Sequence, residues 1–260
     1  AFLIWLQEEY VFENTLTKCS KRIGSRGLQA HAQALRAFAS WLHRERYADS
    51  HVLASLRLPR AQSKEIATFS NDQIKALLKA INTRSATGAR DCAFILLLLD
   101  TGLRVSEACS LTLDHLNLDE GTAKVMGKEG KERTVPLGVT TRKALWKWVN
   151  QHRPRTESHF VFVTSGGDEM ARQVAGRIVR RRGDAVGLTG VRCSPHTFRH
   201  TFAISYLRNG GDVFTLQHIL GHTTMDMVRR YVNVASTDVQ AAHRKFSPVD
   251  NLALPASKSK

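Results

Sequence analysis

Cysteine, acidic residues and long apolar runs are all scarce in this sequence. The four cysteines lie far apart and form no C-x-x-C pair: Cys19, Cys92, Cys109 and Cys193. This spacing argues against a disulfide framework and against a zinc finger, and it favours reduced thiols in a cytoplasmic protein. The longest apolar run, residues 93–99, is much too short to cross a bilayer, so we expect no membrane partner.

The shortage of acidic residues leaves a strongly basic chain. The sequence has 38 Lys and Arg against 23 Asp and Glu, which gives a formal net charge of +15 over 260 residues. Nucleic acid is the polyanion that most often accounts for such an excess, and RNA-binding proteins share it with DNA-binding ones. The charge therefore indicates a nucleic-acid partner without choosing between DNA and RNA.

The chain is predicted to form two units joined by a linker. Residues 1–58 have helical periodicity, clearest over 28–43, where apolar side chains recur at three- and four-residue steps. Residues 1–6 have neither the basic flank nor the cleavage site of a signal peptide, and without an initiator Met we expect a truncated start. Residues 59–68 combine proline, small polar residues and charge without periodicity, as an interdomain linker does. Residues 69–260 form the second unit.

The whole chain is predicted to be mainly α-helical with a small β-sheet, an α+β fold. Ser70 and Ser194 are expected N-caps, and Gly102 is expected to close a buried helix in the left-handed conformation. Two strands are expected around a charged hairpin turn that contains Lys128. In the second unit, helices are predicted from Ser70 and at 91–100, 139–152, 171–186 and 195–208, followed by two short helices that end near Tyr231 and a last helix at 237–246. Strands are predicted at 122–126, 133–137 and 160–163.

Five local patterns carry groups suited to chemistry, although each alone has an ordinary structural explanation. In the first, Arg104 and Glu107 lie three apart at a predicted helix start, where a surface ion pair is the common outcome. The second is the hairpin turn with Lys128, Lys131 and Arg133, whose side chains would usually be solvated. Neither pattern is specific by itself.

The other three patterns contain histidines and a tyrosine. His196 and His200 lie one helical turn apart and are candidate metal ligands, but no carboxylate or Cys at suitable spacing completes a site. His196 and Arg199, three apart, share a helix face on which both can bind one anion. His222 follows a helix-ending glycine, where a cap is usual, and Tyr231 comes nine positions later, where a lone tyrosine is usually half-buried core.

Together the five patterns resemble the tyrosine recombinase (phage integrase) family. The matching segments are TGLRVSEA, GKEGKERTVPLG, SPHTFRHTFA and LQHILGH, the last followed by Tyr231. Their order and internal spacing agree with the family from about residue 69 to residue 246, nearly the whole second unit. The first unit, basic and helical, is similar to that family's core-binding domain with a weaker sequence signal. The resemblance implies a core-binding domain and a catalytic domain that close around DNA as a C-shaped clamp.

Position by position, the resemblance implies a complete active site. Tyr231 would be the nucleophile, and Arg104 and Arg199 would clamp the phosphate. Glu107 matches the family's accessory carboxylate, which supports the site without reacting. The implied catalytic residues are Arg104, Lys128, His196, Arg199, His222 and Tyr231.

These residue types suit attack on a phosphodiester. The five-coordinate phosphorane carries about two negative charges, which always-protonated guanidinium groups can bind bidentately. Tyr231, with an ordinary pKa of about 10, must lose its proton during attack. Lys128, preferred to Lys131 because it directly follows the glycine that ends the first strand, is the candidate general acid for the leaving 5′ oxygen. The 3′-phosphotyrosyl bond conserves the ester energy, so we expect no metal, ATP or other cofactor.

Basic side chains outside the active site are candidate DNA contacts. The predicted helix at 171–186 is densely cationic with little acid to compensate it. A solvated face is the alternative explanation, and phosphate contact is favoured over it. The candidate DNA-binding residues are Lys131, Arg133, Arg172, Arg177, Arg180 and Arg181.

The favoured hypothesis is a site-specific recombinase of double-stranded DNA, located in the cytoplasm with the nucleoid. It would assemble as a homotetramer on two DNA sites from free monomers or dimers. A mobile-element integrase is the first choice and a Xer-type dimer resolvase the alternative, while motif spacing disfavours a type IB topoisomerase. A non-catalytic DNA-binding regulator is the competing class, and the complete set of reactive residues argues against it. The helix at 237–246 would dock either on a neighbouring protomer or on its own domain.

Overall fold

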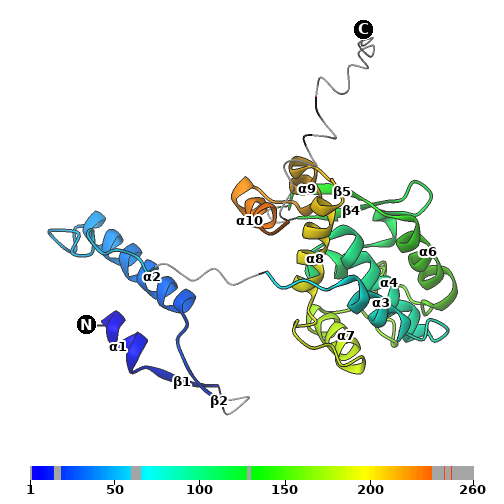
Figure 1. Ribbon diagram of the computed structural model, residues 1–260, viewed down its shortest axis with the longest axis horizontal. Coiled ribbons are helices and arrows are strands. Elements are labelled where there is room, and N and C mark those ends of the chain that lie inside the picture. Colours follow the sequence, from blue (N-terminus) through cyan, green and yellow to red (C-terminus); the bar gives the residue numbers. More distant parts are fainter. Residues whose placement is uncertain are drawn as a thin grey trace, which may run out of the picture. The chain divides into compact units, whose positions relative to one another are not determined.

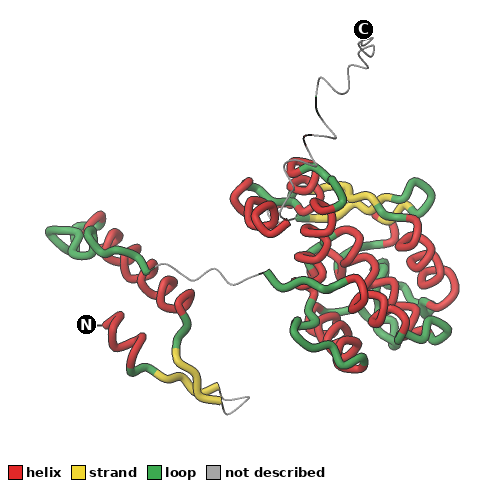
Figure 2. Tube along the Cα trace, in the orientation of Figure 1, coloured by secondary structure: helices red, strands yellow, loops and turns green. Residues whose placement is uncertain are grey.

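The computed structural model describes residues 2–14, 19–59, 66–127, 130–235, 243 and 247. The chain divides into two compact units, Ala1–Glu65 and Ile66–Lys260, whose elements are shown in Figures 1 and 2. Among the described residues, no helix combines the length and the apolar content that a membrane span requires.

The first unit contains a β-hairpin between its two helices. Its elements are α1 (Phe2–Glu8), β1 (Val11–Asn14), β2 (Cys19–Arg22) and α2 (Ser25–Arg44). The prediction of helix throughout is wrong over 11–14 and 19–22: Val11 and Phe12 favour extended backbone, and β1 pairs antiparallel with β2. The helix predicted over 28–43 is confirmed as part of α2, with Leu28, Ala32 and Ala39 buried.

The second unit is mainly α-helical with a small antiparallel sheet, as predicted. Its elements are α3 (Asn71–Lys79), α4 (Ala86–Thr101), α5 (Val105–Cys109), η1 (Leu113–His115), β3 (Leu116–Asn117), β4 (Thr122–Met126), β5 (Glu132–Pro136), α6 (Val139–Lys147), η3 (Trp148–His152), α7 (Arg172–Ala185), α8 (Pro195–Arg208), α9 (Val213–Leu220) and α10 (Met225–Ala235).

Helix α4 lies at the centre of this unit and packs against α6 and α8 (Figure 1). It is apolar on nearly every side, which a helix surrounded by other elements requires. Its buried residues include Phe94, Ile95 and Leu98. The helix ends at Gly102 with φ 62°, and a Cβ there would lie 2.4 Å from the ring of Phe202. The predicted left-handed closure is thus confirmed, at a position that has room only for glycine.

The sheet has the order β3–β4–β5 and presents one face to the core. On β5, Arg133 and Val135 are both buried and alternate with exposed residues. The strand predicted at 122–126 is confirmed, and the one predicted at 133–137 begins and ends one residue earlier. In place of the strand expected at 160–163, Phe160 and Val163 each form an isolated bridge.

The helix starts that carry the later motifs follow the predicted caps. The Ser70 side chain accepts the Gln73 N–H in a capping box at α3. The Ser194 side chain accepts the Thr197 N–H, and Pro195 is the first residue of α8, as expected. The helices predicted at 139–152 and 171–186 are confirmed as α6 with η3 and as α7. Of the helix predicted at 237–246, only His243 is among the described residues.

A buried carboxylate ties α7 to α4. Asp91 of α4 is fully buried and accepts from Arg90 at 2.9 Å, from Arg182 at 2.7 Å and from Arg181 at 3.5 Å. Arg90 is itself 8% exposed at its side chain. This cluster fixes the basic helix α7 on the core of the unit.

We expect Asp91→Ala to lower the free energy of unfolding by about 3–5 kcal/mol, because it leaves Arg90 buried without its carboxylate. Urea unfolding measures this loss. The matched control is Asp184→Ala, which removes a pair with Arg180 at 3.9 Å whose side chains are 75% and 76% exposed; it should cost at most about 1 kcal/mol. Equal losses in the two variants would contradict a structural role for the Asp91 cluster.

Candidate active site

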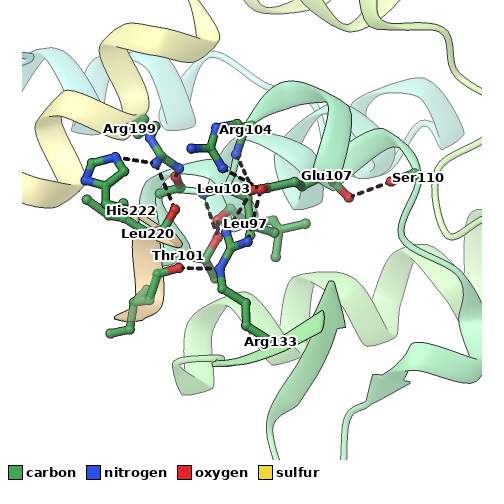
Figure 3. A network of polar contacts seen from close by, with 12 residues as sticks. Leu97, Thr101, Leu103, Arg104, Glu107, Ser110, Arg133, Arg199, Leu220 and His222 are labelled. Carbon is green, nitrogen blue, oxygen red and sulfur yellow. Dashed lines mark hydrogen bonds and ion pairs between the residues drawn. The ribbon is translucent and has the colours of Figure 1, made fainter. Parts of the chain in front are cut away.

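Glu107 organises the arginines on one side of the site. Arg104 is the N-cap of α5, and the Glu107 carboxylate accepts its backbone N–H at 2.8 Å and its Nη1 at 2.9 Å. Arg133, from β5, donates to both oxygens of the same carboxylate at 3.0 and 2.8 Å (Figure 3). Burial alone raises the pKa of Glu107, but the hydrogen bonds from Arg133 and Arg104 outweigh it and leave the pKa below its ordinary value. Glu107 is therefore ionised and fixes both guanidinium groups.

Arg133 also reaches the turn that carries His222. Its Nε donates to the Ile219 carbonyl at 2.8 Å, and its guanidinium lies against Gly221. Gly221 has φ 63°, and a Cβ there would lie 2.8 Å from Arg133 Nη1. This side chain is buried and bound within the protein, so its placement does not match the expected surface contact with DNA.

Arg199 of α8 joins the ends of two helices. Its Nη1 donates to the Gly102 carbonyl at 2.6 Å, and its Nη2 donates to the Leu220 carbonyl at 2.8 Å. Carbonyls at helix C-termini lack intrahelical partners and carry partial negative charge. Burial first, and then the charge of Arg104, lower the pKa of Arg199 to about 10. The guanidinium thus remains protonated at neutral pH.

The hydrogen bond between Arg199 and His222 decides which ring nitrogen of His222 is protonated. Arg199 Nη2 lies 2.8 Å from His222 Nε2 (Figure 3), and a guanidinium can only donate. His222 Nε2 must therefore accept, and Nδ1 carries the hydrogen. That Nδ1 is buried and has no partner among the described residues. It is a buried donor, and His222 itself lines the pocket described next.

Tyr231 of α10 faces the same pocket. The pocket has a volume of about 190 Å³ and is lined by Ile66, Arg104, His196, Arg199, His200, His222, Met227, Arg230 and Tyr231. Tyr231 is 5% exposed, and its ring stacks near that of His222 with centroids 6.3 Å apart. Burial raises the pKa of Tyr231 against the opposing charges of Arg199 and Arg230. At neutral pH the phenol keeps its proton.

The structure brings together the described members of the predicted catalytic set. Arg104, His196, Arg199, His222 and Tyr231 line one pocket, and Glu107 holds Arg104 at its edge. Lys128 lies outside the described residues.

The predicted DNA-binding set divides by exposure. Lys131 is exposed, and so are four arginines of α7 or its start: Arg172, Arg177, Arg180 and Arg181. Arg181 and Arg180 make long ion pairs at 3.5 and 3.9 Å. Arg133 is the member that the structure places inside the protein.

The sequence prediction overlooked His200 as a site residue. Its Nδ1 lies 3.0 Å from the Tyr231 hydroxyl, and the two rings are 5.6 Å apart. The sequence pattern alone makes His200 a candidate metal ligand and gives it no other role. The available signal was its position four residues after His196 on α8, which places both on one face of the helix.

His222 makes the folded protein sensitive to acid. Burial first, and then Arg199 and Arg104, lower the pKa of His222 from 6.5 to about 4. The unfolded chain therefore binds a proton between these values that the folded chain does not, so stability is lost as the pH falls through this window. From pH 7.5 to pH 5 we expect a loss of about 2 kcal/mol from this group alone.

The measurement is urea unfolding at both pH values for the wild type and for His222→Asn. The variant should lose about 2 kcal/mol less over the same interval. His200, whose pKa is also lowered by burial and by neighbouring cations, contributes equally to both proteins and cancels. Identical pH dependence in wild type and variant would contradict a neutral His222.

Comparisons with known proteins agree on one family. A model of the phage integrase family matches residues 67–238. The tyrosine recombinase XerD of Vibrio cholerae is 35% identical over 222 residues, which cover 83% of this chain and 72% of that protein. The crystal structure of XerA recombinase is 26% identical with a TM-score of 0.59, covering 95% of this chain and 79% of that one. The crystal structure of XerH site-specific recombinase bound to palindromic difH substrate, a post-cleavage complex, has a TM-score of 0.69 at 21% identity. The match covers 88% of this chain and 68% of that one and shows a similar fold.

Proposed function

Because the chain belongs to the phage integrase family and is a tyrosine site-specific recombinase, we propose that Tyr231 cleaves DNA by attacking a backbone phosphate. The observation that carries this proposal is the shared pocket: the Tyr231 side chain lines the same small cavity as Arg104, Arg199 and His222. A phosphate in that cavity meets a nucleophile and several fixed donors at once.

The donors left over in the pocket suit a phosphorane. Arg199 directs three of its five N–H groups to described partners, so two remain for a phosphate oxygen. The Arg104 side chain is one-third exposed and bonds Glu107 through its Nη1 alone among the side-chain nitrogens. His222 lines the pocket beside them. Donors that are fixed before the reaction stabilise developing charge without having to reorganise.

The proposed step balances as a simple transfer. The Tyr231 oxygen forms a bond to phosphorus, the bond from phosphorus to the 5′ oxygen breaks, and a 3′-phosphotyrosyl ester remains. Lys128 is our candidate for the acid that protonates the leaving 5′ oxygen. Rejoining reverses these events with another 5′ hydroxyl, so the ester energy is conserved.

A nicked suicide substrate carrying the cognate site tests this proposal. Cleavage next to the nick releases a short fragment, which prevents rejoining and traps the protein on DNA. We expect an adduct that survives denaturing gels and maps by peptide sequencing to Tyr231. A protein that binds the site without forming an adduct is a regulator, and that result would overturn the proposal.

The proposed partner is double-stranded DNA, which both a core-binding domain at 1–58 and a catalytic domain at 69–260 would bind. The XerH structure contains a difH substrate, which supports DNA as the partner here. The exposed arginines of α7 would contact phosphates. Assembly as a homotetramer on two sites, from free monomers or dimers, completes the proposal, together with a cytoplasmic location on the nucleoid.

We expect Arg180→Ala to reduce the slope of log K against log salt by about 0.9, because one phosphate contact releases roughly one counterion. Fluorescence anisotropy with duplex DNA at several salt concentrations measures the slope. The control is Lys75→Ala on α3, since Lys75 pairs with Asp72 at 3.9 Å just as Arg180 pairs with Asp184. An equal change in the control would mean that α7 is not the contact surface.

The proposed biological role is integration of a mobile element. Similarity to XerD favours a second candidate, a Xer-type dimer resolvase. Mapping the DNA covalently trapped by the protein in its host separates the two. Adducts at both ends of one element support the first role, and adducts at a single chromosomal site support the second.

A further inference from the structure

His200 contacts the reacting atom of Tyr231. Its Nδ1 lies 3.0 Å from the Tyr231 hydroxyl oxygen, within the range of a direct hydrogen bond. Helices α8 and α10 pack against each other along this contact, so the geometry is set by two helices of the core. Both side chains line the pocket proposed for the phosphate.

The surroundings of His200 keep its ring neutral. Burial lowers the pKa of His200, and the neighbouring charges of His196, Arg230 and Arg199 lower it further. At neutral pH one ring nitrogen therefore holds a lone pair. When the hydrogen sits on Nε2, Nδ1 accepts the hydrogen bond from the Tyr231 hydroxyl.

Of the other two pocket histidines, His196 and His222, His222 has a ring contact with Tyr231, but it is unsuited to accept that proton. His222 Nε2 already accepts from Arg199, and its Nδ1 carries the hydrogen. Neither nitrogen of His222 offers a lone pair to Tyr231. His200 does, at hydrogen-bond distance.

We propose that His200 is the proton acceptor for Tyr231 during DNA cleavage, an inference that rests on the proposed function. The Tyr231 O–H bond breaks as the bond from its oxygen to phosphorus forms, and the proton moves to His200 Nδ1. The electron pair of the bond from phosphorus to the 5′ oxygen leaves with that oxygen, which takes its proton from the separate acid. In the rejoining step His200 returns its proton to the departing phenol.

The direction of transfer follows from the coupling of the two events. Before attack the phenol holds its proton more tightly than the neutral imidazole would. Bonding to phosphorus withdraws electrons from the phenolic oxygen, so its proton becomes strongly acidic as the new bond forms. The bound phosphate also offsets the cations around His200 and makes the imidazole a better base.

The test separates activation of the nucleophile from protonation of the leaving group. Two suicide substrates are compared, one natural and one with sulfur as the 5′ bridging atom of the scissile phosphate, since a thiolate leaves without a proton. The variants are His200→Ala and His200→Asn; the Asn amide oxygen can accept a hydrogen bond near the Nδ1 position but takes no proton. His218→Asn, an exposed histidine on α9, is the matched control, and thermal unfolding checks the fold of each.

Loss of a general base should slow single-turnover adduct formation by about 10²-fold or more on both substrates. The wild-type rate should fall at acid pH, where His200 is protonated, and the His200→Asn rate should lack that dependence. The wild type and His200→Asn share the same groups facing His200, so a difference between their two pH profiles comes from position 200. These groups are Arg104, His196, Arg199, His222, Arg230 and Tyr231.

Three results would overturn the inference and leave the proposed function intact. A His200→Ala rate within about threefold of wild type would show that no base is lost. Restoration by sulfur would place His200 at the leaving group, and full activity of His200→Asn would reduce it to a positioning residue. If His200→Ala does not fold, the adduct rates of His200→Asn on the two substrates decide the question. The absence of any adduct with wild type would instead sink the proposed function itself.

Discussion

Replacing Tyr231 with phenylalanine is expected to reduce covalent protein–DNA adduct to below detection while DNA binding is retained. The substitution removes one oxygen from a ring that is 5% exposed and packed between α8 and α10. The lost hydrogen bond to His200 should cost only about 1 kcal/mol of stability. The nucleophile is lost with the fold intact.

The assay is the nicked suicide substrate, with anisotropy of the same DNA as the binding measure. Tyr206→Phe is the matched control, since Tyr206, on α8, also packs against another aromatic ring, that of Phe202, and is not among the residues that line the pocket. It should form adduct at the wild-type rate. Adduct formed by Tyr231→Phe would mean that another residue attacks, and the assignment of the nucleophile would be wrong.

Replacing Arg199 with lysine is expected to slow adduct formation by roughly 10²–10³-fold, the usual effect of losing one preorganised donor to a developing oxyanion. Lysine keeps the charge but has a single nitrogen, which cannot serve two carbonyls, His222 and a phosphate together. The Gly102 and Leu220 carbonyls would compete with the phosphate for it.

Binding and chemistry must be measured separately here. One phosphate contact among many contributes little to DNA affinity, so the single-turnover rate should fall far more than the affinity. Arg104→Ala is the companion variant because Arg104 is partly exposed and its removal disturbs the core less. Rates within about tenfold of wild type in both variants would contradict the clamp.

Most of the fold was predictable because its signals are local. Caps such as Ser70 and Ser194 and the glycine closure at Gly102 are fixed by side chains within a few residues. The hairpin of the first unit was not, because Val11 pairs with Arg22 across the turn and helical periodicity was extended through both strands. Strand pairing depends on partners that a window of periodicity does not contain.

The residues of the candidate active site also differ in how far local sequence signals predict them. The pairing of Arg104 with Glu107 was predictable from their three-residue spacing, while their active-site roles followed only from the family resemblance. The burial of Arg133 depends on a carboxylate 26 positions away. Alternation held the missing signal: Arg133 is two residues before Val135, so both face the core. His200 was overlooked because α10 brings the Tyr231 hydroxyl to it from 31 positions further along the chain.

The turn before His222 leaves this chain little freedom to diverge. Gly221 combines a left-handed backbone with direct contact to the guanidinium of Arg133, so any larger residue meets two separate obstacles, of which only one could be relieved by a compensating change at position 133. A chain that keeps this turn must therefore keep glycine at position 221.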